Sequence, residues 1–343
     1  MKQINWGIIG LGAIALQFAN GFKFTNNSKL LGAASNDEKK IKNFREQFNL
    51  AEEYCYHDYD NLIRNKDIEI IYIALPTSLH FKWVTNCLKA GKKVLVEKPA
   101  TINSLEAEKI KKNFFNEKTF FSEAMMYLYH PQIHKTLELI KSDKIGELIS
   151  IESFFGRDIL TKKNFFGFKK RKKIDPENRL YNKKLGGGAI LDLGCYPVSF
   201  STLIGSIKSP ISFDKIEIID KKIEIGSTGV DLDSYIELKF ENDFKSRIGA
   251  SFTKNLGNQS KITGSRGEIL IQDTWTAQPS KITIKKNGKE EEVINIDCNE
   301  NIYSYEIESI SQSIINNQTK VNYPGLRIDD IILNMKIIDN WIN

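Results

Sequence analysis

The sequence predicts an α/β protein of two domains, in which a doubly wound parallel sheet precedes an α+β domain with an open, mostly antiparallel sheet. Three observations predict this architecture. Apolar strand-like runs alternate with helical patterns in the first third of the chain, alternating apolar and polar residues dominate after about residue 122, and 343 residues exceed one ordinary core. We expect domains over 1–122 and 123–343, with the last helix packing back on an earlier element.

The first domain is expected to open with a βαβ unit. The apolar run INWGIIG precedes a helical pattern, LGAIALQFANGF, and a second apolar run, KLLGAAS. The turn from Gly10 to Ala15 reads G-x-G-x-x-A, in which the glycines allow a tight turn and a close approach to a pyrophosphate. Glycines end strands in many folds, but this motif follows a strand and opens a helix, which favours a dinucleotide site.

The alternation continues to residue 122. The helical patterns DEKKIKNFREQF, HFKWVTNCLKAG and SLEAEKIKKNFF alternate with the apolar runs EIIYIALPT and KKVLVEKP. Ligands bind such sheets beyond the carboxyl ends of the strands. The cofactor-binding residues that we expect there are Gly10, Leu11, Gly12, Ala13, Ile14, Ser35, Asn36, Lys40, Leu75, Pro76, Thr77, His80, Glu97 and Lys98.

The end of the second strand bears on the choice of cofactor. An NAD site usually presents an acid there to the ribose 2′-hydroxyl, whereas this chain offers Ser35 and Asn36, with Lys40 close behind. These groups suit a 2′-phosphate. We therefore expect NADP, with NAD as the second choice should Asp37 turn inward.

The second domain contains the segment LGGGAILDLGCYPV, residues 185–198, between runs that alternate as strands do, with Asn287-Gly288 as a hairpin turn. The glycines indicate a loop whose backbone approaches another group closely. Asp192 and Tyr196 share a face if a helix continues through them, although Pro197 disfavours helical geometry at Tyr196. From this segment alone, a core aromatic and a helix-capping acid are the simpler explanation.

Three motifs in this order resemble the Gfo/Idh/MocA oxidoreductases: Gly10-x-Gly12-x-x-Ala15, Glu97-Lys98-Pro99, and Gly186-Gly187-Gly188-x-x-x-Asp192-x-Gly194-x-Tyr196. The resemblance implies a Rossmann domain and a second domain whose open sheet often mediates dimerisation. It also implies that Lys98 lies beside the nicotinamide and that its Lys-Pro peptide is commonly cis. Many members carry histidine at the position of Tyr196. With tyrosine there, the chain resembles a subgroup that includes glucose–fructose oxidoreductase, dimeric dihydrodiol dehydrogenase and sugar ketoreductases.

The resemblance implies hydride transfer between the nicotinamide and a carbinol or carbonyl carbon of a sugar or related cyclic polyol. Tyr196 is the expected acid/base, because a tyrosine can move the hydroxyl proton once its pKa falls from about 10, and a nearby Lys98 ammonium favours the phenolate. Asp192 is expected to orient the substrate or the lysine. The alternatives are a trans-dihydrodiol dehydrogenase and a dinucleotide-binding regulator without turnover. For the first, Phe154, Phe155, Phe165 and Phe166 could line an aromatic pocket, or they could simply belong to the core.

Composition excludes several other classes. The four cysteines are far apart and form no C-x-x-C pair, so we expect neither a disulfide framework nor a metal site. No apolar run approaches the roughly 20 residues of a membrane-spanning helix, and the N-terminus lacks the order of a signal peptide. We therefore expect a cytoplasmic protein without a membrane partner.

The remaining expectations concern partners. The basic run Lys162 to Lys173 contains no acid; a solvated loop is the simpler explanation, and a cationic flap that favours an anionic substrate is the alternative. Neither a recognised nucleic-acid-binding fold nor a broad basic face is evident, so no nucleic-acid partner is expected. The expected partners are a sugar-like small molecule and further copies of the chain, in a homodimer or higher homo-oligomer formed through the C-terminal sheet.

Overall fold

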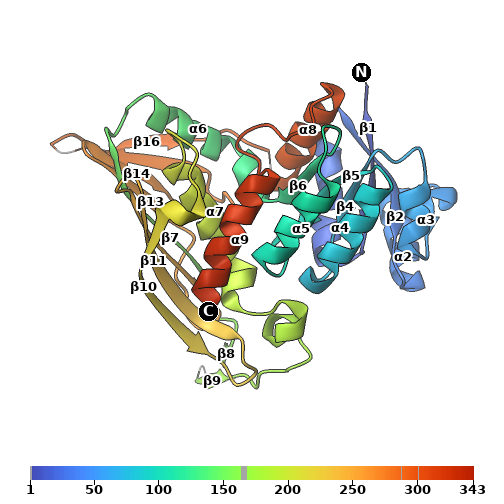
Figure 1. Ribbon diagram of the computed structural model, residues 1–343, viewed down its shortest axis with the longest axis horizontal. Helices are drawn as coiled ribbons and strands as arrows, with labels where there is room; N and C mark the ends of the chain where they lie inside the picture. Colours follow the sequence, from blue (N-terminus) through green and yellow to red (C-terminus); the bar gives the residue numbers. More distant parts are fainter. Residues whose placement is uncertain (1, 164–167, 287, 300) are drawn as a thin grey trace. The chain divides into compact units, whose positions relative to one another are not determined.

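The computed structural model (Figure 1) describes residues 2–163, 168–286, 288–299 and 301–343, and the chain divides into two compact units. The first comprises Met1–His130 and Asn299–Ile332, and the second comprises Pro131–Cys298 and Leu333–Asn343. Each unit therefore contains two separate stretches of chain. The domain boundary expected at residue 122 stays a prediction.

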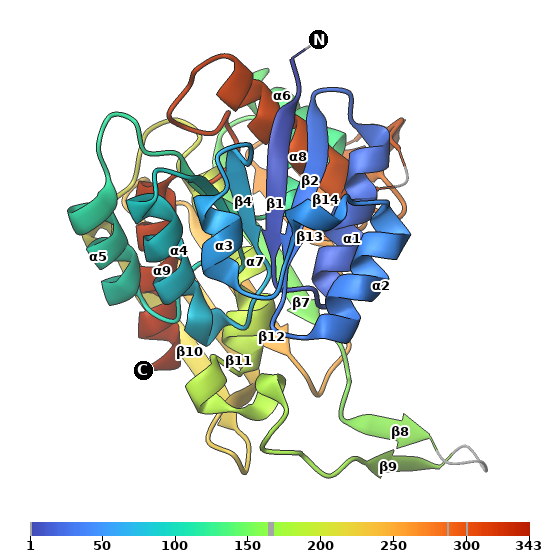
Figure 2. The ribbon, with the colours of Figure 1, turned by 90° about the vertical axis from the view of Figure 1, so that its right-hand side faces the viewer.

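The first unit contains a six-stranded parallel sheet with the order β3-β2-β1-β4-β5-β6. Its strands are β1 (Ile4–Ile9), β2 (Ser28–Ala34), β3 (Cys55–Tyr56), β4 (Ile70–Ile73), β5 (Lys93–Glu97) and β6 (Phe121–Ala124). The connecting helices are α1 (Ala13–Gly21), α2 (Glu38–Phe48), α3 (Tyr59–Arg64), α4 (His80–Lys89) and α5 (Ser104–Phe114), of which α4 and α5 lie side by side (Figure 2). This is the predicted doubly wound sheet, and its strand order reverses between β1 and β4, where such sheets bind ligands.

The stretch from Asn299 to Ile332 returns to this unit, which the sequence did not predict. Its helix α8 (Ile302–Ile315) packs against α1, so closely that a Cβ on Gly21 would lie 2.9 Å from Ile307. The indole of Trp6 in β1 donates a 2.9 Å hydrogen bond to Ser311 of α8. The first unit is therefore completed by residues far along the chain.

The second unit contains an eight-stranded sheet with the order β10-β11-β12-β7-β13-β14-β15-β16. All neighbours pair antiparallel except β12 and β7, which confirms the mostly antiparallel sheet. The strands are β7 (Leu148–Gly156), β10 (Ile216–Ile225), β11 (Asp231–Phe240), β12 (Lys245–Ser251), β13 (Ser260–Gly264), β14 (Gly267–Ile271), β15 (Lys281–Lys285) and β16 (Glu292–Asn295). Asn287 of the expected hairpin turn lies outside the described residues.

Helices cover one face of this sheet. Its helices are α6 (Pro131–Lys141) and α7 (Cys195–Gly205), together with the end of α9 (Ile328–Ile342). Along β11 and β12 the residues facing α7, such as Ile236 and Ile248, are fully buried, whereas their neighbours face the opposite side. The hydroxyl of Thr202 in α7 donates a 2.7 Å hydrogen bond to Asn334 of α9, which joins the two helices within this unit.

The segment Lys183–Gly205 differs from the expectation that no apolar run of the chain is long enough to span a membrane. With a mean hydropathy of 1.2 it is long and apolar enough to cross a membrane by length and composition alone. However, 83% of its most apolar window is buried inside the structure, as is typical of a core helix. Its apolar residues are explained by packing between the sheet and α9.

Candidate active site

The glycine turn after β1 has the geometry that a dinucleotide site requires. Gly10 has a φ of +87°, and a Cβ there would lie 2.6 Å from the carbonyl oxygen of Ala74. A Cβ at Gly12 would meet no protein atom within 4 Å, so protein packing does not explain this glycine. Gly12 also caps α1 without a side-chain hydrogen bond, which leaves the first N–H groups of the helix for an anionic ligand. The turn therefore fits the pyrophosphate of a dinucleotide.

The loop after β2 engages two of its polar side chains internally. The Asp37 carboxylate accepts a 3.1 Å hydrogen bond from the Lys40 amide and so caps α2. The hydroxyl of Ser35 accepts the Asp37 amide at 3.1 Å and is almost fully buried. Asn36 and the Lys40 side chain are exposed. Asp37 therefore caps α2, but its side chain is 49% exposed and its carboxylate lies 4.0 Å from the Lys40 ammonium, so the exposed groups at this strand end are an amide, a cation and an acid.

The loop after β4 is joined to the Lys98 loop by His80. One ring nitrogen of His80 lies 2.7 Å from the carbonyl oxygen of Leu75, and the other lies 2.9 Å from that of Pro99. Burial lowers the pKa of His80 to about 4, although the two carbonyls favour the charged ring. The neutral ring carries one N–H and donates to one of the carbonyls at a time. Of the other predicted residues here, Leu75 and Pro76 are at least partly exposed and Thr77 is buried.

Lys98 lies at the carboxyl end of β5 on a backbone that buried side chains hold. The Lys98-Pro99 peptide is cis, and the Lys98 side chain is half-buried. The Glu123 carboxylate in β6 accepts the Ala100 amide at 2.7 Å, and His80 contacts the Pro99 carbonyl. The segment on the carboxyl side of Lys98 is therefore fixed at two consecutive residues.

Glu97 fixes the other side of Lys98. Its carboxylate accepts the Lys98 amide at 3.2 Å and the hydroxyl of Tyr72 from the neighbouring strand. Burial, reinforced by the adjacent Glu97, raises the pKa of Tyr72 well above its usual value, so this hydroxyl keeps its proton and donates. Glu97 is buried and thus supports the loop from inside the first unit.

In the second unit, the triple glycine packs against two other segments. Gly186 and Gly188 have φ values of +79° and +121°, and a Cβ on Gly187 would lie 2.7 Å from the carbonyl oxygen of Arg179. The Gly188 amide donates to the carbonyl of Leu180 at 3.0 Å. A Cβ on Gly188 would collide with the carboxylate of Asp231. The close approach predicted for these glycines is therefore to the Arg179 turn and to β11.

Asp231, the first residue of β11, caps the helix that follows the glycines. Its buried carboxylate accepts the Ile190 amide at 2.7 Å. Burial raises the pKa of Asp231 to about 6, and the amides of Ile190 and Ala189 and the Ser234 hydroxyl offset part of that rise. The helix begins with a π-helical turn, Ile190–Gly194, and continues as α7. Asp231 therefore stabilises the start of the segment that carries Asp192 and Tyr196.

Pro197 does not interrupt this helix. It is the third residue of α7 and closely follows the π-helical turn Ile190–Gly194, and the helix continues across it although proline lacks the N–H of a helical hydrogen bond. The π-helical turn contains Asp192, and such turns are frequent at functional sites. The helix therefore continues from Asp192 through Tyr196, as the shared face requires.

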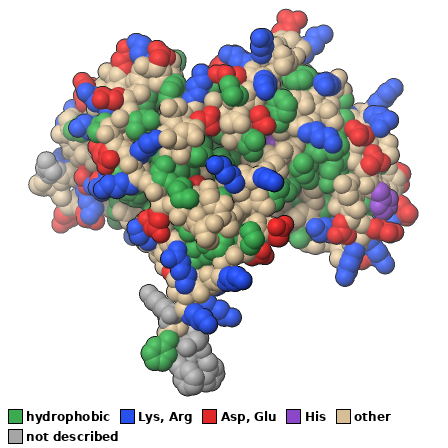
Figure 3. Space-filling view, turned by 60° about the horizontal axis from the view of Figure 1, so that its bottom comes forward, with side chains coloured by type: hydrophobic (Ala, Val, Ile, Leu, Met, Phe, Trp, Pro, Cys, Tyr) green, Lys and Arg blue, Asp and Glu red, His purple; other side chains and the backbone are tan. Residues whose placement is uncertain are grey.

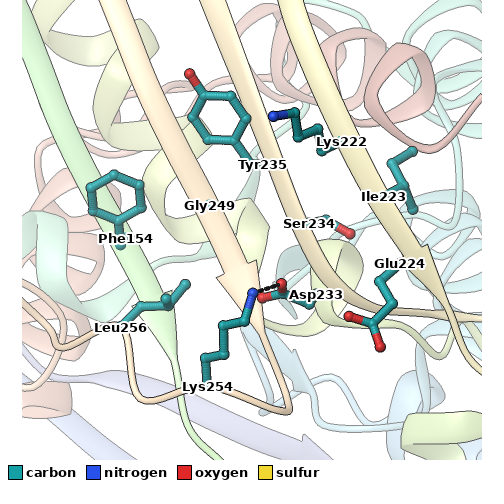
Figure 4. A pocket seen from close by; sticks show the side chains of 10 residues that line it. All are labelled: Phe154, Lys222, Ile223, Glu224, Asp233, Ser234, Tyr235, Gly249, Lys254 and Leu256. Atoms are coloured by element: carbon teal, nitrogen blue, oxygen red, sulfur yellow. Dashed lines mark hydrogen bonds and ion pairs between the residues drawn. The ribbon is translucent and has the colours of Figure 1, made fainter.

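Tyr196 packs among aromatic side chains of the second unit. Its ring centroid lies 5.3 Å from that of Phe155 in β7 and 5.8 Å from that of Trp275, and Tyr196 is 7% exposed. Phe154 is next to Phe155 on the strand and points to the opposite face of the sheet, where it lines a groove (Figure 4). Phe155 can thus contribute to an aromatic pocket beside Tyr196, and Phe154 cannot. The other two phenylalanines considered, Phe165 and Phe166, lie outside the described residues.

Asp192 is largely buried and pairs with a residue of the turn that the glycines pack against. The Arg179 guanidinium donates to the Asp192 carboxylate at 3.3 Å, with exposed side-chain fractions of 61% and 17% respectively. Because Arg179 is mostly exposed, this ion pair contributes little to stability, but it places a cation beside Asp192.

The basic run forms part of a hairpin, not a plain loop. Strands β8 (Thr161–Lys163) and β9 (Lys169–Arg171) pair antiparallel, and the hairpin extends away from the large sheet (Figure 2). Lys162, Lys170 and Arg171 are exposed, and Figure 3 shows Lys and Arg side chains gathered where this arm leaves the surface. Residues 164–167 of the run lie outside the described residues. Solvation explains the exposed cations without a bound ligand.

Two family models match the chain. The model described as "Oxidoreductase family, NAD-binding Rossmann fold" matches residues 4–123, and the model described as "GFO/IDH/MocA C-terminal domain" matches residues 133–270. The chain belongs to the Gfo/Idh/MocA oxidoreductase family. It is therefore an oxidoreductase with an NAD-binding Rossmann domain, which confirms the resemblance drawn from the three motifs.

Similar proteins in this family include trans-1,2-dihydrobenzene-1,2-diol dehydrogenase of Xenopus tropicalis, which is 28% identical over 288 residues, covering 83% of this chain and 79% of the relative. A 3-ketoreductase from Actinomadura kijaniata, solved in complex with NADP and TDP-benzene, aligns with a TM-score of 0.80 and 21% identity over 98% of this chain and 96% of that one. An aldose-aldose oxidoreductase from Caulobacter crescentus, complexed with glycerol, aligns with a TM-score of 0.84 and 19% identity over 99% and 96%. Both structures share the fold of this Gfo/Idh/MocA protein.

The structure also identifies supporting residues that sequence reasoning missed in this Gfo/Idh/MocA protein. Glu123, Asp231 and Arg179 contact the predicted site residues or the backbone beside them, yet each lies on a different strand or turn. An acidic residue at the end of an apolar, strand-like run is the sequence signal that could have pointed to Glu123 and Asp231. Within the part of the chain that the structure describes, no group of three or more His, Cys, Asp or Glu residues is placed to hold a metal ion.

Proposed function

We propose that this protein transfers a hydride between NADP and a carbinol or carbonyl carbon of a sugar or related cyclic polyol. The observation that carries the proposal is the half-buried Lys98 on a loop that Glu97, Glu123 and His80 hold at the carboxyl edge of an NAD-binding sheet. Such preorganisation is what proton transfer and charge stabilisation at a reacting oxygen require. The names of the ketoreductase and the aldose-aldose oxidoreductase support a sugar-like substrate.

In this proposal the bound cofactor donates or accepts the hydride, and the side chains handle the proton and the developing charge. Tyr196 gives the proton to the carbonyl oxygen during reduction and takes it from the hydroxyl during oxidation. The Lys98 ammonium binds the same oxygen and stabilises its negative charge. Asp192, on the same helix as Tyr196, accepts a substrate hydroxyl or orients Lys98.

For the cofactor, we propose a preference for NADP. It is supported by the exposed Asn36 and Lys40 at the end of β2 and by the capping role of Asp37, in which one carboxylate oxygen already accepts the Lys40 amide. Fluorescence titration with NADPH and NADH tests this preference, and tighter binding of NADH would refute it.

A second candidate is trans-dihydrodiol dehydrogenase activity. It is favoured by the relative at 28% identity and by Phe155 and Trp275 beside Tyr196, because flat aromatic walls suit an aromatic diol. A panel of sugars, keto-sugars and dihydrodiols, run with the preferred cofactor, separates the two activities. Cofactor binding without oxidation or reduction of any panel member would instead support a regulator.

We further propose a cytoplasmic homodimer or higher homo-oligomer formed through the open face of the eight-stranded sheet. That face carries a groove lined by residues of β7, β10, β11 and β12, including Phe154 and Tyr235 (Figure 4). Ile219 and Ile225 on the edge strand β10 are exposed, as apolar side chains at an interface would be in one isolated chain. Light scattering after size-exclusion chromatography tests the assembly, and a monomer at micromolar concentration would refute it.

A further inference from the structure

The indole of Trp275 packs against three other aromatic rings of the second unit. Its ring centroid lies 5.8 Å from that of Tyr196, 5.9 Å from that of Phe155 and 6.1 Å from that of Phe200. Trp275 is fully buried, whereas Tyr196 and Phe155 keep 7% and 8% of their surfaces exposed. A substrate beside Tyr196 therefore meets the two exposed rings, and Trp275 supports them from within the unit.

The neighbouring rings contact Tyr196 at different angles. The planes of Tyr196 and Phe155 meet edge to face at 83°, and those of Tyr196 and Trp275 meet at 58°. Phe155 and Trp275 stack on each other with 26° between their planes. Aromatic pairs favour such edge-to-face and stacked arrangements, and side chains in a close-packed interior resist reorientation. The phenol ring of Tyr196 is therefore held in one orientation by two mutually stacked neighbours.

Strand β7 fixes the indole itself. The indole N–H of Trp275 donates a 2.9 Å hydrogen bond to the backbone carbonyl of Phe154. The next residue of the same strand, Phe155, supplies the ring on which the indole stacks. One strand thus provides both a polar contact and an apolar contact, and together they set the position and the tilt of the indole.

The backbone of Trp275 is held by the Asp273 carboxylate, which is 7% exposed. This carboxylate accepts the amides of Trp275 and Thr276 at 3.2 and 2.9 Å, the Thr276 hydroxyl at 2.6 Å and the Asn258 side-chain amide at 3.3 Å. Gln132 of α6 donates to the Asp273 carbonyl at 2.8 Å. Hydrogen bonds to a charged acceptor are stronger than neutral ones, so Asp273 makes this turn rigid.

The same turn contains a residue in an unfavourable backbone conformation. Ala277 is buried and has a φ of +55°, in the left-handed region that favours glycine. Such conformations persist only where the surrounding structure constrains them, and they cluster at functional sites. The hydrogen bonds to Asp273, and that from the Ser280 hydroxyl to the Ala277 carbonyl at 2.6 Å, supply this constraint. The turn that presents Trp275 is therefore held in shape from both sides.

We propose that Trp275 is a positioning residue for Tyr196, and that Asp273 acts through Trp275. The indole fixes the orientation of the phenol ring and so places the hydroxyl that gives or takes the proton. A displacement of about 1 Å at a reacting group can cost about 10²-fold in rate, so loss of this support should lower kcat. This inference rests on the proposed role of Tyr196 as the acid/base, but the packing of its ring can be measured without turnover.

The first test observes the Tyr196 ring without substrate. The protein is produced with 3-fluorotyrosine, and the Tyr196 signal in the ¹⁹F NMR spectrum is identified by its absence in Tyr196→Phe. Packing against the neighbouring rings should displace this signal from its position in the urea-unfolded protein, and Trp275→Leu should return it most of the way. Trp6→Leu is the matched control and should leave the signal in place, because Trp6 is also fully buried with an indole hydrogen bond of 2.9 Å but lies in the first unit.

An unchanged Tyr196 signal in Trp275→Leu would overturn the proposal. If Trp275→Leu does not fold, Asp273→Ala replaces it and should move the Tyr196 signal in the same direction. Asp273→Asn should restore the signal, because its side-chain oxygen can still accept the amides of Trp275 and Thr276. A Tyr196 signal that stays in place in Asp273→Ala would overturn the proposal in the same way.

The second test uses turnover and separates this inference from the proposed function. Trp275→Leu should lower kcat about 10- to 100-fold and leave NADPH affinity within about two-fold. In the Tyr196→Phe background the same substitution should change kcat by no more than about two-fold, because the hydroxyl that Trp275 places is already gone. An equal loss in both backgrounds would show a purely structural role and overturn the inference. Absence of turnover in the wild type would refute the proposed function, while the NMR result would still decide whether Trp275 positions Tyr196.

Discussion

Replacing Asp231 by asparagine should change how the stability of the protein depends on pH. Burial raises the pKa of Asp231 from 3.8 to about 6, so the folded state binds its proton more tightly than the unfolded state does. The stabilisation by this proton is complete below the unfolded pKa and is lost as the pH rises through 6. At about 1.4 kcal/mol per pKa unit, the full effect is about 3 kcal/mol, of which about 1.3 kcal/mol is lost between pH 5 and pH 7.

The assay is urea unfolding of the wild type and Asp231→Asn at pH 5, 6 and 7. The wild type should lose about 1.3 kcal/mol more unfolding free energy than the variant between pH 5 and pH 7, since asparagine does not titrate. Asp231→Ala serves as a second comparison and should be less stable at every pH, because it removes the helix cap altogether, at a cost of about 1 kcal/mol. A difference between wild type and Asp231→Asn that stays constant with pH would refute the assignment of Asp231 as a buried, titrating cap.

Four further predictions concern residues of the site and of the glycine loops. Tyr196→Phe should reduce turnover by about 10²- to 10⁴-fold and leave NADPH affinity within two-fold; near-wild-type turnover would exclude Tyr196 as the acid/base. Gly12→Ala should weaken NADPH binding in a fluorescence titration while the unfolding free energy stays within about 0.5 kcal/mol, because its Cβ meets no protein atom. Gly187→Ala should instead cost about 1 to 3 kcal/mol of stability, because its Cβ meets two carbonyl oxygens; unchanged stability would contradict the packing. Lys40→Ala should weaken NADPH binding about ten-fold and NADH binding little, and an equal loss for both would contradict the phosphate contact.

The parts of the fold that could be predicted from the sequence are those encoded locally. The glycine turn at Gly10 and the alternation of apolar strands with helices lie within short stretches, so the parallel sheet could be derived from them. The return of α8 to the first unit could not be predicted, because its contacts, such as that between Trp6 and Ser311, join residues 305 positions apart. Periodicity carries no information about such distant packing.

The candidate site also divides into residues that could be predicted from the sequence and residues that could not. Gly12, Lys98 and Tyr196 belong to motifs that are visible in the sequence, whereas the groups that hold them do not. Asp231 lies 41 residues beyond the amide that it binds, and Glu123 lies on the neighbouring strand of the sheet from Lys98. The π-helical turn at Asp192 was equally hidden, since Pro197 indicated a break where the structure continues the helix.

Transfer of deuterium from the cofactor tests the central claim most directly. The protein is incubated with NADPH that carries deuterium at the transferable C4 position and with each carbonyl compound of the sugar and diol panel. Mass spectrometry then measures deuterium on the carbinol carbon of the product. We predict one deuterium per product molecule with the wild type and a rate at least about 100-fold lower with Tyr196→Phe. NADPH binding without deuterium in any product would contradict the assignment of this protein as a hydride-transferring enzyme of sugar-like substrates.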